Sequence, residues 1–167
     1  MVKYLGIILI IMSCTGIGLN ASNKLKNYRN SCRRLIEIVN SIAVMIRYKQ
    51  MTFYEIAGEL KTQSELSQMQ FVRYLPTSYN GIKSFSEEWE YSARHDCEIG
   101  EEEKNLLCGL ASKLGTTDTS GQLSSLELLN EQLKKIEIRR NDEYSRKGKL
   151  YRSIGLLAGI MIGIVVI

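Results

Sequence analysis

The sequence predicts an all-α protein, an antiparallel six-helix bundle flanked by two membrane-spanning segments. Only one proline occurs in 167 residues, whereas strand-rich sandwiches and barrels usually need more turn-forming residues. Both ends of the chain are apolar and almost free of charge, and the apolar residues between them recur in helical steps of three and four. We therefore expect an N-terminal transmembrane anchor at residues 1–23, a helical bundle at 24–152 and a C-terminal transmembrane segment at 153–167.

The N-terminal segment has no charged side chain between Lys3 and Lys24, and residues 4–19 are apolar or small. A signal peptide would need a small-residue cleavage site, for which Leu19-Asn20-Ala21 is a poor match. A lipoprotein would be acylated at Cys14, which ends a loose lipoprotein-like box. We expect an uncleaved anchor instead, because a second apolar segment and a basic flank beyond the first give a consistent topology.

The C-terminal segment is uncharged but shorter than the roughly 20 residues that a perpendicular span prefers. Arg152 can extend its charge to the membrane surface, and Tyr151 suits the interface. Small residues recur every four positions in this segment, a pattern that lets another helix approach closely: Gly155, Gly159 and Gly163. The helix that packs there is either the first span, where Cys14, Gly18 and Ser22 have the same spacing, or a helix of another subunit or protein.

Positive charge follows the first span and precedes the second. The bases expected to face the membrane are Lys24, Lys26, Arg29, Arg33, Arg34, Arg146, Lys147, Lys149 and Arg152. Because basic flanks stay on the cytoplasmic side, we expect the bundle to be cytoplasmic. Anionic membrane lipid explains these bases well. Nucleic acid is not expected as a partner, since no binding fold or aromatic-basic pattern accompanies them.

The first half of the middle region predicts three helices. The first runs from the membrane to about Gln50, with its apolar face at Leu35, Ile38, Ile42, Met45 and Ile46. Thr52 and Glu55 form a capping box that begins the second helix, which ends near residues 61–64. A short third helix is expected from Glu65 to about Leu75, because Pro76 stops it.

The second half also predicts three helices. Ser84 and Glu87 form another capping box, and Phe85 and Trp89 follow as an i, i+4 pair expected to anchor the core. A fifth helix begins at Glu101, with a buried face at Leu106, Leu107, Leu110 and Leu114 and with Gly115 as its C-cap. The last helix begins past Asp118 or Ser120 and runs towards the membrane, with its apolar face at Leu126, Leu129, Leu133 and Ile136.

Acidic residues gather between Glu87 and Glu103, where eight acids accompany one base, Arg94. Such a stretch is usually a solvated helix face. The functional alternative is a docking surface for a partner protein, since segregated charge helps to steer encounters. The residues proposed for docking on this helix are Glu87, Glu88 and Glu90.

Residues that would carry catalysis are missing. No phosphate-binding glycine loop, nucleophile elbow or zinc-protease motif occurs. His95, the single histidine, is expected to be an ordinary surface residue, and one imidazole cannot supply a two-histidine metal site. The four cysteines, Cys14, Cys32, Cys97 and Cys108, are interpreted as small buried residues of a reducing compartment. We expect no catalytic residue, metal or cofactor.

Four stretches, taken in order along the chain, resemble the stage III sporulation protein AB family of endospore-forming bacteria. They are the N-terminal apolar anchor, residues 46–48 followed by 51–55, residues 114–122 and residues 149–155. The resemblance covers essentially the full length, and its specificity comes from the order and spacing of Leu114-Gly115, Asp118, Gln122 and the terminal Lys-x-Tyr-Arg-Ser-x-Gly. Thr52-Phe53 replaces a Pro-Leu pair that is usual in the family, and both pairs start a helix.

The resemblance implies a non-enzymatic component of the channel between mother cell and forespore, placed in the mother-cell membrane. Members are similar to the cytoplasmic six-helix domains of type II secretion inner-membrane platform proteins. The implied partners are a sporulation secretion-type ATPase and other membrane proteins of the same assembly. Asp118 and Gln122, in the connection before the last helix, either cap that helix or present a docking surface, and capping is the safer interpretation.

Two other classes of function stay open. A membrane-anchored small enzyme would need a pocket containing titrating groups. A lipoprotein acylated at Cys14 would place the bundle outside the cytoplasm, against the charge distribution. The sequence leaves open the number of copies in the assembly and whether residues 153–167 cross the membrane fully.

Overall fold

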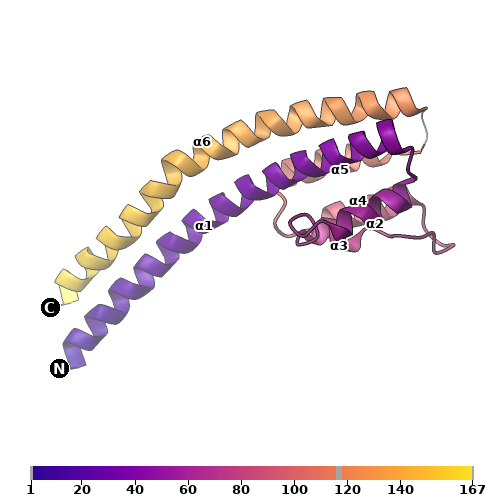
Figure 1. Cartoon of the computed structure of the whole chain (residues 1–167). Coiled ribbons are helices and arrows are strands. Elements are labelled where there is room, and N and C mark those ends of the chain that lie inside the picture. Colours follow the sequence, from indigo (N-terminus) through magenta and orange to yellow (C-terminus); the bar gives the residue numbers. More distant parts are fainter. Residues whose placement is uncertain (1, 116–117, 167) are drawn as a thin grey trace. The chain divides into compact units, whose positions relative to one another are not determined.

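The computed structural model describes residues 2–115 and 118–166, and every regular element in this part of the chain is helical. The all-α prediction is therefore confirmed. Met1, Thr116, Thr117 and Ile167 lie outside the described residues. The elements, drawn in Figure 1, are α1 (Val2–Val44), a π-helical turn (Met45–Lys49), α2 (Phe53–Thr62), α3 (Gln70–Tyr74), α4 (Phe85–His95), α5 (Glu101–Ala111) and α6 (Thr119–Val166).

Two compact units make up the chain. The first unit combines Met1–Arg29 with Ile138–Ile167 and so contains the beginning of α1 and the end of α6. The second unit is Asn30–Glu137, which holds the remainder of both long helices and all of α2 to α5. The functional residues predicted from sequence are divided between the two units, and each unit is described separately.

In the first unit the backbones of α1 and α6 are in contact. A Cβ atom added at Gly155 would lie 3.1 Å from the Cα atom of Gly18, and one added at Gly159 would lie 3.0 Å from the Cα atom of Ile11. Ordinary side chains do not fit at such distances, so small residues are needed here. Gly163 is buried as well. The glycine stripe of α6 therefore packs on α1 of the same chain.

One helical stretch of the described residues, Ile8–Lys49, is long and apolar enough to cross a membrane, judged by length and composition. Its N-terminal part exposes large apolar side chains, since Ile8, Leu9, Met12 and Ile17 are all more than half exposed. The C-terminal part of α6 exposes a similar set: Ile154, Leu157, Met161 and Ile164.

The second unit has its core around two aromatic rings. Phe71 and Trp89 are buried and meet edge to face, with centroids 4.8 Å apart. The Trp89 Nε1–H donates to the carbonyl of Leu107 at 2.9 Å, which satisfies the polar atom of the buried indole. Phe85 lies at the margin, 6.2 Å from Trp89. Helical spacing correctly placed Leu35, Ile38, Ile42, Leu126, Leu129, Leu133 and Ile136 in the core. Leu106, predicted on the buried face of the fifth helix, is only partly buried.

Both predicted capping boxes are present. The Thr52 N–H donates to the Glu55 carboxylate at 2.7 Å and the Glu55 N–H donates to the Thr52 hydroxyl at 3.4 Å. The same reciprocal pair joins Ser84 and Glu87, at 2.7 and 3.3 Å. Each box satisfies two N–H groups that a helix start would otherwise leave without an acceptor. The starts of α2 and α4 are therefore set locally.

Two helix boundaries differ from the prediction. The third helix was expected from Glu65 to Leu75, but α3 covers only Gln70–Tyr74 and residues 64–68 form turns. The reason lies elsewhere in the chain, because the buried Asp96 carboxylate accepts from the Phe71 N–H at 2.8 Å and fixes where α3 begins. The fifth helix ends at Ala111, and Gly115 follows with φ +76° in a separate turn.

The cysteine prediction was wrong for one residue. All four thiols are free; Cys32 is buried and Cys14 and Cys108 are partly buried, but Cys97 is exposed. Cys97 follows the end of α4, where Asp96 turns the chain by accepting from the Glu98 N–H at 2.8 Å. The carboxylate takes the interior position at this turn, so the neighbouring thiol is left at the surface.

Candidate partner-binding surface

A polar hollow of about 380 Å³ opens at one end of the second unit. Two segments of the chain that are far apart in sequence form it, residues 46–53 and residues 119–122. The first joins the π-helical turn to the start of α2, and the second is the start of α6. The lining residues are Ile46, Arg47, Gln50, Met51, Thr52, Phe53, Thr119 and Gln122.

The backbone beside the hollow is unusual. The π-helical turn Met45–Lys49 ends at Gln50, whose φ of 51° and ψ of 34° lie in the left-handed region. Gln50 is the one non-glycine residue with positive φ in the described part of the chain. Both features cost free energy relative to a regular helix and occur often at functional sites. They place Arg47 and Gln50 on the wall of the hollow.

Arg47 carries the positive charge of this wall. Its guanidinium lies 3.2 Å from the carboxylate of Glu127 on α6, and both side chains are substantially exposed, at 48% and 68%. Exposed ion pairs of this kind stabilise a protein by only about 0.2–1 kcal/mol. The pair is therefore easily opened.

Asp118 caps α6. Its carboxylate accepts from the Gly121 N–H at 3.1 Å and from the Ser120 hydroxyl at 2.6 Å, and these bonds hold its pKa below the usual aspartate value. The capping interpretation of Asp118 is therefore supported directly. Gln122, the second residue predicted in this connection, lines the hollow, while Asp118 does not.

The acidic residues singled out on α4 all have partners within the chain. Glu87 belongs to the capping box with Ser84, whose hydrogen bonds lower the pKa of the Glu87 carboxyl. Glu88 accepts from the side-chain amide of Asn80 at 3.4 Å, and Glu90 pairs with Arg94 at 2.7 Å.

Two further acids of the predicted acidic stretch, Asp96 and Glu103, are buried. They are removed from solvent, so the acidic surface is smaller than the sequence indicates.

Phe53 links the start of α4 to the hollow. This hollow-lining ring stacks on Phe85, the first residue of α4, with centroids 5.3 Å apart. A Cβ atom added at Gly115 would lie 3.9 Å from the same Phe53 ring. The start of α4 and the segment leading into α6 therefore both adjoin one wall of the hollow. Sequence reasoning missed Arg47, Gln50 and Thr119 as residues of one site. Arg47 and Thr119 lie in stretches that resemble the family, but nothing local gave any of the three a role.

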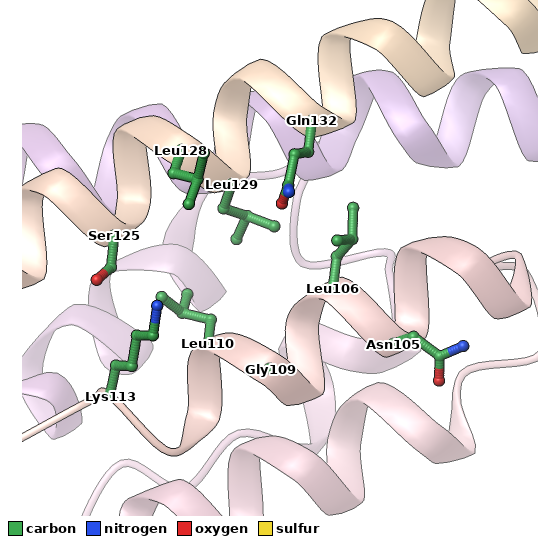
Figure 2. A pocket seen from close by; sticks show the side chains of 9 residues that line it. All are labelled: Asn105, Leu106, Gly109, Leu110, Lys113, Ser125, Leu128, Leu129 and Gln132. Atoms are coloured by element: carbon green, nitrogen blue, oxygen red, sulfur yellow. The ribbon is translucent and has the colours of Figure 1, made fainter.

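An apolar groove of about 210 Å³ lies between α5 and α6 (Figure 2). Leu106 and Leu110 from α5 and Leu128 and Leu129 from α6 point into the space between the two helices, whereas Asn105 points away from it. Gly109 has open space above its Cα atom. The groove is a second hollow on this unit, with few charged groups around it.

The predicted membrane-facing bases fall into two sets. Lys24, Lys26, Arg146, Lys147 and Lys149 are exposed in the first unit. Two of these also make contacts within the chain, since Lys24 lies 5.8 Å from the ring centroid of Tyr28 and Lys147 lies 4.0 Å from the Glu143 carboxylate. Arg152 is exposed as well, and it donates to the Ser22 hydroxyl at 3.0 Å. The remaining three are more enclosed or belong to the second unit: Arg29 lies 4.6 Å from the ring centroid of Tyr144, Arg33 pairs with Glu137 at 2.6 Å, and Arg34 is partly buried.

His95 is exposed and stacks on Tyr91 with ring centroids 3.9 Å apart. Among the residues that the structure describes, no group of three or more His, Cys, Asp or Glu is arranged to hold a metal ion.

Comparison with known proteins identifies a family. The model of the family described as stage III sporulation protein AB matches residues 3–167. No curated protein and no solved structure matches significantly. The match covers nearly the whole chain, including both apolar ends and both segments that form the polar hollow.

Proposed function

The chain belongs to the stage III sporulation protein AB family, and on that premise we propose that it is a non-enzymatic membrane scaffold of the sporulation channel between mother cell and forespore. Because the family is a sporulation family, the role of this protein is in sporulation. The helical bundle of residues 24–152 faces the mother-cell cytoplasm. It docks a secretion-type ATPase and other membrane proteins of the channel. The model for this arrangement is the cytoplasmic six-helix domain of type II secretion platform proteins.

The observation that carries this proposal is the pairing of the two apolar ends. Residues 1–23 and 153–167 are uncharged over long stretches, and in the first unit they pack through Gly18, Gly155 and Gly159. A helix pair with large apolar side chains outside and glycine contacts inside suits a bilayer, where close packing holds helices together. We infer that both segments enter the membrane, as an anchor that tethers the bundle at both ends.

Exposed bases next to these segments support the orientation. Lys24, Lys26, Arg146, Lys147 and Lys149 are available to anionic lipid, each contributing on the order of 1 kcal/mol near such a surface. Positive flanks also keep the intervening domain on the cytoplasmic side.

Co-purification from sporulating membranes tests the proposal. The secretion-type ATPase is expected to co-purify with the wild-type protein. Two sets of variants then locate the docking surface: a triple charge reversal at Glu87, Glu88 and Glu90, and Asp118→Lys. Asp118→Asn is the matched control, since asparagine caps a helix as well as aspartate but carries no charge.

Each outcome has a distinct meaning. Loss of the ATPase in the α4 variant, with circular dichroism unchanged, maps docking to α4. Loss in both Asp118 variants maps docking to the negative charge of Asp118, whereas loss in Asp118→Lys alone shows that this negative charge is not needed for docking. Absence of the ATPase even with the wild-type protein contradicts the docking role and leaves a structural membrane subunit.

A further inference from the structure

We propose that Arg152, held between α1 and α6 in the first unit, binds the phosphate of an anionic phospholipid at a defined site. The inference rests on the proposed function, because it requires the two apolar ends to lie in a membrane. It goes beyond the general attraction of exposed bases to anionic lipid, since it assigns particular donors to a single headgroup. These donors are the Arg152 N–H groups and the Tyr144 O–H.

Hydroxyl groups from both helices hold the Arg152 side chain. Its Nε–H donates to the Ser22 hydroxyl at 3.0 Å, and an Nη2–H donates to the Tyr144 hydroxyl at 3.5 Å. Both acceptors are uncharged, and in the part of the chain that the structure describes Arg152 has no ion pair with a carboxylate. A guanidinium carries five N–H donors in a planar fork, so others remain for an anion.

Close packing fixes the two hydroxyl-bearing side chains. Ser22 is buried, and a Cβ atom added at Gly148 would lie 3.3 Å from the Ser22 Oγ atom and 3.2 Å from the Tyr144 ring. From α1, the Arg29 guanidinium lies 4.6 Å from the centroid of the same ring, as a cation–π contact. Arg152 itself is exposed. The result is a guanidinium that is oriented by its neighbours and still accessible to a ligand.

The charge around Arg152 favours an anion. Residues 22–29 and 140–152 hold eight bases against two acids, a net charge of +6. One of the acids, Glu143, lies 3.5 Å from Arg140 and 4.0 Å from Lys147, so bases of the same helix already neutralise it. An anionic headgroup is preferred to a zwitterionic one, because the latter brings its own cation to a positive surface.

The position of Arg152 in the chain suits a lipid better than a soluble phosphate. No charged side chain follows it, and Ser22 lies just before Lys24, where the uncharged N-terminal stretch ends. Both contact residues thus lie at the ends of apolar segments, the level at which headgroups meet a membrane protein. Leu156, one helical turn beyond Arg152, is 47% exposed and is available to an acyl chain. A phospholipid gains both contacts, whereas inorganic phosphate gains only the polar one.

Lipid retention by the purified full-length protein tests the inference. The protein is extracted in a nonionic detergent and titrated with phosphatidylglycerol, and native mass spectrometry counts the lipids bound to each molecule. Phosphatidylcholine and inorganic phosphate are the comparison ligands. The variants are Arg152→Gln, Arg152→Lys and Tyr144→Phe. Arg146→Gln is the matched control, since Arg146 is also an exposed arginine of α6 and its replacement changes the charge equally.

We expect one phosphatidylglycerol to bind more tightly than any further copy. Arg152→Gln weakens its binding by about tenfold or more, because charge-assisted hydrogen bonds are lost. Tyr144→Phe weakens it by roughly two- to tenfold, because one neutral hydrogen bond is lost. Arg152→Lys keeps the charge but loses the planar fork, so it weakens binding by about threefold or more. Arg146→Gln changes it by less than about twofold, since salt screens exposed charges that lie outside the site.

The two conservative variants keep the test valid if Arg152→Gln disturbs folding, which circular dichroism would show. The inference is overturned if phosphatidylcholine binds as tightly as phosphatidylglycerol, or if Arg152→Lys and Tyr144→Phe bind the lipid as the wild-type protein does. It is also overturned if inorganic phosphate displaces the lipid, because the site is then one for a soluble anion.

Failure of this inference is distinguishable from failure of the proposed function. If the ATPase co-purifies and no phosphatidylglycerol is retained, the scaffold function stands and the lipid site is wrong. If phosphatidylglycerol is retained through Arg152 and the ATPase does not co-purify, the lipid site stands and ATPase docking fails.

Discussion

Replacing Gly159 with cysteine tests whether the two apolar ends pair within one chain. A Cβ atom at position 159 would lie 3.3 Å from the Cβ atom of Cys14, which is native to the sequence. The same Cβ atom would lie 3.0 Å from the Cα atom of Ile11, so the two helices must separate by a few tenths of an ångström to accept the new side chain. That separation also brings the Cβ to Cβ distance into the range of about 3.5–4.5 Å that disulfides need. We expect Gly159→Cys to cross-link to Cys14 within the same polypeptide when native membranes are oxidised.

The assay is the change in gel mobility after maleimide–polyethylene glycol labelling under denaturing conditions. Cys97, the exposed thiol, is first replaced by serine so that it cannot link two molecules. Ile160→Cys is the matched control, because the native Ile160 side chain, next to Gly159 in the chain, is 41% exposed. The expected result is rapid protection of both thiols in Gly159→Cys, independent of protein concentration, and none in Ile160→Cys. Disulfide-linked dimers from Gly159→Cys, or equal reaction of the two variants, would refute the intramolecular pairing.

Three further predictions follow from the second unit. Asp96→Ala removes the acceptor of two N–H groups and should lower the free energy of unfolding by about 3 kcal/mol, as measured by denaturation in detergent. Hydrogen bonds of the capping boxes lower the pKa values of Glu55 and Glu87, so both carboxylates stabilise the folded protein above about pH 4.3, and this stability is lost as the pH falls through their folded pKa values. The double variant Glu55→Gln and Glu87→Gln should show a smaller loss of thermal stability between about pH 6 and pH 3, as measured by thermal unfolding. Cys97 should react with a maleimide before Cys108, whose thiol pKa is raised by burial, and mass spectrometry of labelled peptides would show the order.

Local signals explain why much of the fold could be predicted. A capping box lies within four consecutive residues, so Thr52 and Ser84 marked the starts of α2 and α4 correctly. Helical spacing likewise identified the buried face of α6, because Leu126 to Ile136 lie on one side of one helix. These features depend on contacts between close neighbours in sequence, and a single sequence contains them.

Contacts between distant residues explain what could not be predicted. The start of α3 depends on Asp96, 25 residues beyond Phe71. The polar hollow depends on bringing residues 46–53 beside residues 119–122, and on a π-helical turn that no local pattern indicated. The candidate acids on α4 were found by charge alone, and the structure shows that Glu87 and Glu90 already have partners.

The pairing of α1 with α6 is specified by polar contacts, because apolar faces alone do not determine which helices pair. Several helices of this chain have similar leucine-rich faces, and such faces alone permit more than one arrangement. In the second unit the Asn130 side-chain amide donates to Asn40 at 2.8 Å and the Cys32 thiol donates to the carbonyl of Leu133 at 3.4 Å. In the first unit Arg152 donates to Ser22. Each unit thus has its own polar contact between the same two helices.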